Sequence, residues 1–593
     1  MNSLVALLIG VGAIAVGYFV YARSINTNII QPDGKKATPA KMFMDGVDFT
    51  PANRNVLFGY QFKSIAALGP ILGPIIAVQW GWLPALLWIV VGTFFIGWVQ
   101  DYTSIMIGVR EEGQSFGALS YRLISPRSRM ILLIFIYFYL WLIMGSFGTQ
   151  VGYTFFTTPT VPLGVILIIL IGVLAGQMTY KWKMDIILTS VITVVLAFVG
   201  IYLSTLPAVQ SLFKSIYGIT VDAAGKASAS PNLFLTITQA KLFGSLLMVV
   251  IIYFGAVLPI WRYAQPINYV AFWIVTLGIL GGVVGLLIWH PGMADFPSFT
   301  TFNVAGLGPL WPILFVSIAC GAISGWHSLV SSSGTARQLE KETDALYVGG
   351  GAMFLEMFFA IMAFLTATVA FGGYQGYVDA GGGAAAAKVF SVGLATFMNK
   401  WGLGMTLGTV YGSVFLTLMA LTIMYLVVRF MRVASAEALG DKIPAFKNAH
   451  VGTIVALLLT LALIWLVPFL QIWVVFGAAN QLMASLALLL ITLWLKSKGK
   501  NYQWALWPFL FMFVTAIGAL LYKAYESFFL NLPKAADPVA NKIASVGQFV
   551  SAQVIIGAVS LALVVAALLL AWDAWKALSA SGAKAGAKAS VRP

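Results

Sequence analysis

The chain of 593 residues is 60% hydrophobic and only 9% charged, with a mean hydropathy of +0.93. Soluble domains carry about 25% charged residues, so this composition excludes a water-soluble globular fold and indicates a protein that uses lipid as part of its solvent. One cysteine and three scattered histidines (His290, His327 and His450) exclude a disulfide framework, a Cys-rich metal site and a haem or zinc cage. The net charge of +15 comes from Lys and Arg in loops between apolar segments, which argues against a nucleic-acid partner.

Apolar stretches of about 20 residues each predict a transmembrane helix, because lipid offers no partner for a free backbone group. The sequence holds about 15 such stretches, so the predicted fold class is an all-α polytopic membrane protein. They lie at 3–23, 56–80, 82–109, 129–150, 161–180, 184–206, 238–261, 266–290, 310–330, 347–373, 407–429, 450–468, 470–495, 503–526 and 547–572.

Loop charges predict the orientation. If the N-terminus lies outside, 25 of the 34 Lys and Arg residues fall in inside segments and eight in outside segments, while Lys63 lies within a span. This bias predicts that the N-terminus is outside, the C-terminus is cytoplasmic and the number of spans is odd. It places the loops 24–55, 110–128 and 430–449 in the cytoplasm.

Two spans carry helix-breaking residues. The second contains two Gly-Pro pairs, Gly69-Pro70 and Gly73-Pro74, which remove backbone donors and disfavour helix at the preceding glycines. The carbonyls freed there need protein, water or an ion as a partner, although a kinked structural helix fits the same pattern. The seventh stretch is interrupted at Pro259, five spans later, which is the spacing that two five-helix inverted repeats require.

The ninth stretch contains the most polar uncharged run inside any span, 321–335. Its polar members are Ser324, His327, Ser328, Ser331, Ser332, Ser333 and Thr335. Hydroxyl oxygens are ligands for hard cations and donors to carboxylates. A helix end that grades into a Ser-rich loop, with His327 satisfied by a neighbour, fits the pattern equally well.

Three ionisable residues lie deep within predicted spans: Lys63, Asp101 and Glu356. A buried charge in a span costs at least about 2.5 kcal/mol, so each is a functional candidate. Lys63 facing either carboxylate would form a structural ion pair or a proton-linked switch, and the sequence leaves both readings open.

Six short blocks occur in the order of a known family. They are Asp45-Gly46-Val47-Asp48-Phe49-Thr50-Pro51; Val56-Leu57-Phe58-Gly59; the Gly-Pro stretch that continues to Leu83-Pro84 and Leu87-Trp88; Val99-Gln100-Asp101; Ser324-Gly325-Trp326-His327-Ser328-Leu329-Val330-Ser331; and Phe476-Gly477-Ala478-Ala479-Asn480-Gln481-Leu482. Together they resemble the carbon starvation protein A (CstA) transporters, a family similar to the amino acid–polyamine–organocation and LeuT-like carriers. The resemblance implies import of peptides or pyruvate, in some members with protons, when carbon is scarce.

The chain departs from the family pattern at one place. The family reads Phe-Gly-His-His-Phe where this chain has Phe58-Gly59-Tyr60-Gln61-Phe62, followed by Lys63. Any role of that histidine pair in titration or ion binding is therefore absent here, and Lys63 is a candidate replacement.

These observations predict a LeuT-like inverted-repeat core with discontinuous helices. We expect an N-terminal extra helix and cytoplasmic loop (1–55), a ten-helix transport core (56–432), four C-terminal helices (433–576) and a basic disordered tail (577–593). The predicted substrate-binding residues are Gly69, Pro70, Gly73, Ser324, His327, Ser328, Ser331 and Ser332, and the predicted coupling residues are Lys63, Asp101 and Glu356.

The predicted function is secondary active import of small peptides or pyruvate across a bacterial inner membrane, by alternating access and with H⁺ ahead of Na⁺ as the coupling ion. The expected partners are the bilayer and a small substrate, with no nucleic acid, metal or cofactor. The alternatives are an ion channel and a sodium-driven amino acid carrier. An enzyme is not expected, because the sequence has no HExxH, no paired CxxC and no Walker motif.

Overall fold

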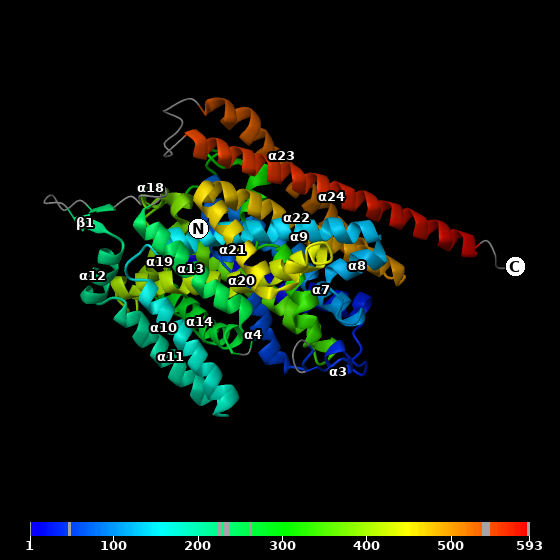
Figure 1. Cartoon of the computed structure of the whole chain (residues 1–593), viewed down its shortest axis with the longest axis horizontal. Coiled ribbons are helices and arrows are strands. Elements are labelled where there is room, and N and C mark those ends of the chain that lie inside the picture. Colours follow the sequence, from blue (N-terminus) through cyan, green and yellow to red (C-terminus); the bar gives the residue numbers. More distant parts are fainter. Residues whose placement is uncertain are drawn as a thin grey trace.

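The computed structural model describes residues 2–45, 49–221, 227–229, 238–260, 262–293, 295–535 and 546–589, which form a bundle of helices (Figure 1). The first half supplies α1 (Ser3–Val16), α2 (Arg23–Ile25), α3 (Pro39–Met42), α4 (Arg54–Ile65), α5 (Gly69–Ala77), α6 (Trp82–Gly92), α7 (Trp98–Arg110), α8 (Phe116–Leu123), α9 (Pro126–Gln150), α10 (Pro162–Gly176), α11 (Ile186–Leu203), α12 (Pro207–Ile216), α13 (Gln239–Val257) and α14 (Ala264–Trp289). The second half supplies α15 (Phe315–Ser317), α16 (Gly325–Ser333), α17 (Gly351–Val369), α18 (Tyr374–Asp379), α19 (Ala386–Asn399), α20 (Met405–Leu439), α21 (Ala449–Leu466), α22 (Phe469–Ser497), α23 (Gln503–Tyr525) and α24 (Val546–Ala589).

Shorter elements join these helices. The helical turns used below are η7 (Leu310–Leu314), η8 (Thr335–Arg337), η9 (Glu342–Asp344) and η10 (Leu346–Gly350). Two small antiparallel ribbons pair β1 (Ile219–Val221) with β2 (Ala227–Ala229), and β3 (Asn303–Val304) with β4 (Gly308–Pro309).

Within the described residues, 13 helices are long and apolar enough to cross a membrane, and the pair Arg54–Ile65 and Gly69–Trp80, bent by 47°, makes up to 14. Each coincides with a stretch predicted from hydropathy, so the all-α polytopic class is confirmed. The predicted stretch 310–330 is neither one of these helices nor part of the bent pair, because its helix is interrupted at 318–324.

Contacts between loops show which helix ends share a side of the bundle. Loops predicted to be cytoplasmic meet one another through Arg110–Glu342 at 3.0 Å, Arg129–Glu437 at 3.3 Å and a backbone bridge between Ala52 and Leu339. Loops predicted to be outside also meet: the amide of Ser3 donates to the carbonyl of Pro291, that of Thr300 to Trp80, and that of Tyr374 to Asp295.

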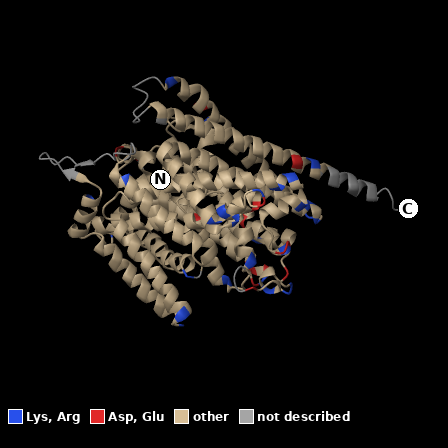
Figure 2. Ribbon diagram, viewed as in Figure 1, with Lys and Arg blue, Asp and Glu red and all other residues tan. Residues whose placement is uncertain are grey.

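Charged residues gather at the end of the bundle where α3 and α8 lie (Figure 2), whereas the end near α12 and α18 carries few. The structure thus separates two ends of unequal charge. Which end faces the cytoplasm stays a prediction from the charge bias.

The segment 310–333 crosses from one end of the bundle to the other although it is not a continuous helix. At the predicted outer end, Trp80 Nε1 donates a hydrogen bond to the carbonyl of Gly308 at 3.3 Å. At the predicted cytoplasmic end, the amide of Ala52 donates to the carbonyl of Gln338 at 3.0 Å. Between them η7 and α15 end at Ser317, residues 318–324 are not helical, and α16 begins at Gly325. This is the second discontinuous span of the fold.

The predicted break at Pro259 is wrong. The helix α13 runs without interruption to Val257, and Pro259 lies in the connection to α14. The side chains of Arg429 and Arg432 donate to the last carbonyls of α13, at Gly255 and Ala256, which ends the helix in an ordinary way. A proline after a helix end stops the helix without opening it at membrane depth.

Two features bear on the expected domain limits. The most apolar part of α22 is completely buried inside the bundle and contacts α16, so one of the four helices expected after residue 432 lies inside the bundle. Helical backbone continues in α24 to Ala589, through most of the tail predicted to be disordered, because that tail is rich in alanine and lysine, which favour helix. Residues 590–593 lie outside the described residues.

Candidate functional site

The first broken span owes its shape to the Gly-Pro pairs. The helix α4 ends at Ile65, and α5 begins at Gly69 with Pro70 in its first turn, where a missing amide donor costs nothing. Residues 66–68 between them are buried. The sequence therefore starts a new helix at Gly69 instead of merely kinking an old one.

The two breaks pack directly against each other, and glycine permits the approach. A Cβ added to Gly73 would lie 2.6 Å from the carbonyl oxygen of Ser317, and one added to Gly321 would lie 2.7 Å from Ala360 Cβ and 3.3 Å from Pro70 Cα. A Cβ on Gly69 would fall within 3.0 Å of the side chain of Cys320. Gly69, Pro70 and Gly73 are thus contact points between the two broken spans.

Side chains from other helices satisfy the carbonyls that the second break frees. Gln481 Nε2 donates to the carbonyl of Phe315 at 2.6 Å, Asn480 Nδ2 to that of Ala319 at 3.2 Å, and Thr93 Oγ1 to that of Gly321 at 3.1 Å. The break is therefore held by protein groups in this conformation.

Asn480 of α22 also caps α16. Its Oδ1 accepts the amides of Gly325 at 2.9 Å and Trp326 at 3.3 Å, together with the hydroxyls of Ser324 at 3.1 Å and Tyr139 at 2.6 Å. The first amides of a helix have no partner within it, so this one side chain decides where α16 begins.

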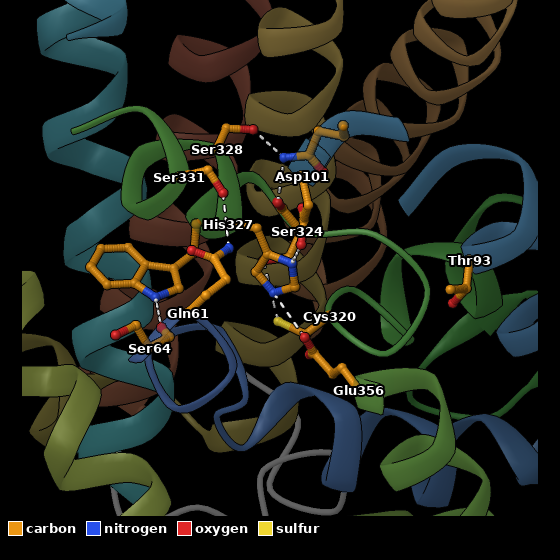
Figure 3. A network of polar contacts seen from close by, with 12 residues as sticks. Gln61, Ser64, Thr93, Asp101, Cys320, Ser324, His327, Ser328, Ser331 and Glu356 are labelled. Carbon is orange, nitrogen blue, oxygen red and sulfur yellow. Dashed lines mark hydrogen bonds and ion pairs between the residues drawn. The ribbon is translucent and has the colours of Figure 1, made fainter. Parts of the chain in front are cut away.

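The indole of Trp326 ties the two breaks together. Its Nε1 donates to the carbonyl of Ser64 at 2.7 Å, one residue before the end of α4 (Figure 3). In the same region Gln61 Nε2 donates to Ser331 Oγ at 2.9 Å. Contacts therefore run from α4 to α16 on both sides of His327.

His327 lies between two carboxylates that come from different spans. Its Nδ1 is 3.0 Å from Asp101 Oδ2 on α7, and its Nε2 is 3.2 Å from Glu356 Oε2 on α17 (Figure 3). All three side chains are completely buried. We call His327, Asp101 and Glu356 the buried triad.

The buried triad is not saturated with hydrogen bonds. Among the described residues, Asp101 Oδ1, His327 Nε2 and both carboxylate oxygens of Glu356 have no hydrogen bond, so His327 and Glu356 are in contact at 3.2 Å without hydrogen-bond geometry. A carboxylate atom buried without a partner costs free energy, so the triad can gain stability by taking up a proton. Its groups do not form a metal site in the described part of the chain, where no set of three or more His, Cys, Asp or Glu side chains is arranged to hold an ion.

Lys63 does not belong to the buried triad, which corrects the predicted pairing with Asp101 or Glu356. Its Nζ donates to Thr422 Oγ1 of α20 at 2.7 Å. Lys63 lies on a different face of α4 from Gln61, whose side chain turns toward Ser331 of α16. The spacing in the sequence gave the depth of Lys63 in the membrane and left its direction open.

The remaining predicted residues divide into two groups. Ser324, Ser328 and Ser331 take part in contacts between helices, and Ser328 accepts a bond from Gln100. Ser332 bonds back to the carbonyl of Ser328 in its own helix at 2.8 Å, which is the structural reading of a helical serine.

Sequence reasoning missed the uncharged amides that organise the site: Gln61, Gln100, Asn480 and Gln481. Each lies within an apolar span, where a polar amide has to find a partner, and this signal could have singled them out. Gln100, Asn480 and Gln481 also belong to the blocks that carry the family resemblance. Residues 46–48 of the first of these blocks lie outside the described residues.

Comparison with known proteins gives the family. The family model described as "Carbon starvation protein CstA" matches residues 2–381 and 376–519. The pyruvate/proton symporter BtsT of Escherichia coli (strain K12) is 31% identical over 380 residues, which cover 62% of this chain and 49% of that protein. The peptide transporter CstA of the same organism is 31% identical over 383 residues, covering 62% and 50%.

The chain thus spans about half the length of the curated relatives it matches. A manganese transporter of known structure from Eremococcus coleocola aligns with 90% of this chain and 99% of its own, at 12% identity and a TM-score of 0.44.

Because the family model covers most of the chain, with the blocks around Asp101, His327 and Asn480 inside the matched residues, this protein belongs to the CstA family.

Proposed function

We propose that the chain is a secondary active transporter that imports a small peptide or pyruvate by alternating access. The observation that carries the proposal is the meeting of two discontinuous spans, 54–80 and 310–333, at buried polar residues. Carriers of the LeuT type bind substrate between two such broken helices. The two relatives, a peptide transporter and a pyruvate/proton symporter, support the same class.

We propose protons as the coupling ion and the buried triad as their site. With His327 charged and both carboxylates ionised, the triad carries one net negative charge, and one further proton makes it neutral. A buried net charge is costly, so the closed arrangement favours the proton-loaded triad. Exposure of the triad to water on either side would let the proton leave, which links protonation to the conformational cycle.

The orientation belongs to the proposal as well. The charge bias supports an N-terminus outside and a C-terminus in the cytoplasm. The bacterial relatives support a bacterial inner membrane as the location. In this orientation the ion-paired end that contains Arg110 and Glu342 is the cytoplasmic end.

The test is uptake into proteoliposomes with an imposed pH or sodium gradient, using labelled pyruvate and alanyl-alanine. The wild type should accumulate one of them when the outside is acidic, with saturation and competition by unlabelled substrate. His327→Gln should retain exchange of substrate but lose accumulation. His450→Gln is the matched control, since His450 lies on the exposed surface against Tyr253.

Other outcomes would contradict parts of the proposal. Accumulation driven by sodium alone would favour the sodium-coupled carrier, and flux without saturation would favour a channel. Pyruvate or peptide chemistry by the purified protein without a gradient would indicate an enzyme. Full pH-driven accumulation by His327→Gln would remove the buried triad from coupling.

A further inference from the structure

Lys63 is a buried lysine for which the described part of the chain supplies no acidic partner. The side chain is 2% exposed and lies in the last turn of α4, beside the first break. Among the described residues its Nζ has one acceptor, Thr422 Oγ1 at 2.7 Å. The Thr422 hydroxyl gives its own proton to the carbonyl of Leu418 at 2.7 Å, so it offers Lys63 a neutral lone pair.

The elements packed against α4 are α14, α16, α17, η8, η10 and α20. Each of their ionisable side chains contacts a group other than Lys63. In α17, Glu356 faces His327 of α16, and in α20, Glu437 pairs with Arg129. The others form hydrogen bonds: Tyr347 with Asn55, Tyr269 with Ser190, Arg337 with the carbonyl of Gly113, and Tyr411, Tyr425, Arg429 and Arg432 with groups of α13 and α14. An acid that neutralises Lys63 therefore has to come from outside this set.

Other buried cations of the chain show the contrast. Lys523 is also 2% exposed and is paired with Glu526, and Arg110 is paired with Glu342, whose side chain is 1% exposed. Buried charges in proteins are paired because an unpaired one is expensive. Among the buried lysines of the described residues, Lys63 has no acidic partner, and it lies where α4 meets α16 and α20.

The surroundings of Lys63 suit the apolar part of a small acid. Its neighbour Phe62 packs edge-on against Phe359 with ring centroids 5.0 Å apart, and Trp326 packs against Phe430 of α20 at 5.5 Å. The Trp326 indole also reaches the carbonyl of Ser64, next to Lys63. These rings place apolar side chains close in the sequence and in the fold to the end of α4 that carries Lys63.

We propose that Lys63 binds the carboxylate of the transported substrate and that Thr422 positions the Lys63 amine for this contact. The inference deepens the proposed function and rests on it. In this structure Lys63 donates to Thr422, and a carboxylate that binds between α4 and α20 supplies the acidic partner that Lys63 lacks. Both candidate substrates supply this group, pyruvate as its own carboxylate and a peptide as its C-terminus.

The test uses the full chain in proteoliposomes with three probes: pyruvate, alanyl-alanine and alanyl-alanine amide. The variants are Lys63→Gln, which removes the charge, Lys63→Arg, which keeps it, and Thr422→Val, which removes the acceptor. Lys523→Gln is the matched control, because that lysine is equally buried and already has its carboxylate partner. Size-exclusion profiles establish that each variant is folded.

Lys63→Gln should raise the KM of the transported acid by roughly tenfold or more, the loss expected for a hydrogen bond to a charged group. Lys63→Arg should restore most of the affinity, and Thr422→Val should raise KM without lowering kcat. Lys523→Gln should leave KM at the wild-type value, although the loss of a buried ion pair lowers its stability. The amide should be a poor substrate of the wild type. Uptake of pyruvate or of the peptide identifies which acid the site takes.

An unchanged KM in folded Lys63→Gln, or equal KM values for the peptide and its amide, overturns the role of Lys63 and leaves transport standing. If the wild type takes up neither acid, the proposed function fails, and titration of the purified protein by tryptophan fluorescence decides the carboxylate site separately. A response that depends on Lys63 supports the site, and no response to either acid overturns it.

Discussion

Replacing Gly69 with alanine tests whether the two broken spans meet as closely as the structure shows. The new Cβ would lie within 3.0 Å of both Cβ and Sγ of Cys320, a separation that real Cβ atoms essentially never show. One side has to move, and overpacking of this kind costs about 1–3 kcal/mol. For a protein that exchanges between closed and open arrangements, this corresponds to a roughly 5- to 150-fold shift against the closed one.

The second substitution in the test removes the clash from the other side. Cys320→Gly deletes both close atoms and leaves the Cα of residue 320 at 3.6 Å, an ordinary contact, so the double variant should recover. Gly59→Ala, also on the first broken span, is the control because nothing lies within 4 Å of its added Cβ. Thermal unfolding in detergent and initial uptake rates are the measurements. A Gly69→Ala protein that matches the wild type, or a double variant no better than Gly69→Ala alone, would refute the close approach.

Asn480→Ala should destabilise the purified protein by at least about 1–3 kcal/mol, because it leaves the buried amides at the start of α16 without an acceptor. The control is Asn448→Ala, which removes an exposed cap of α21 and should cost about 1 kcal/mol. Similar melting temperatures of the two variants would contradict this prediction. Arg110→Ala should lower the free energy of unfolding by about 3–5 kcal/mol, because it leaves Glu342, which is 1% exposed, without its partner. Lys41→Ala should lower it by at most about 1 kcal/mol, because Lys41 and Glu340 are 43% and 42% exposed. The reverse order in thermal unfolding would count against the buried pair. In a Cys320→Ala background, single cysteines at Lys36, Tyr121 and Lys442 should resist an impermeant thiol reagent in intact cells and cysteines at Phe302 and Trp401 should react; the opposite labelling would reverse the orientation.

Hydropathy and loop charge predicted the helical spans well because both signals are local. Each apolar stretch that forms a continuous helix was found, and the contacts at Arg110, Arg129 and Tyr374 group the loops as the charge bias does. The Gly69-Pro70 pair also marked a true break, because proline is favoured in the first turn of a new helix, whereas Pro74 of the second pair lies inside the continuous helix α5.

The second break was assigned to the wrong span because a proline in the sequence does not show whether it interrupts a helix or follows its end. Pro259 follows a helix that has already ended. The real break at 318–324 contains no proline, and it exists because Asn480 and Gln481 of α22 satisfy its backbone from a distance in the sequence. Such a tertiary cause leaves no local signal.

The candidate site was predicted in part. His327, Asp101 and Glu356 were each singled out as buried polar groups, but the sequence placed His327 with the substrate and the carboxylates with Lys63. The structure puts the three together and turns Lys63 toward Thr422. Which face of a helix meets which neighbour depends on packing between spans, and spacing along one chain does not contain that information.

The buried position of α22 constrains the order in which the chain matures during synthesis. Asn480 and the amide of Gly325 that it caps are 155 residues apart, so the ribosome makes the gap in the helix long before it makes the groups that close it. An unsatisfied backbone group in hydrocarbon costs several kcal/mol, and residues 318–324 hold several. The nascent segment therefore needs water or protein partners in the meantime, and the centre of this bundle is completed only when α22 arrives.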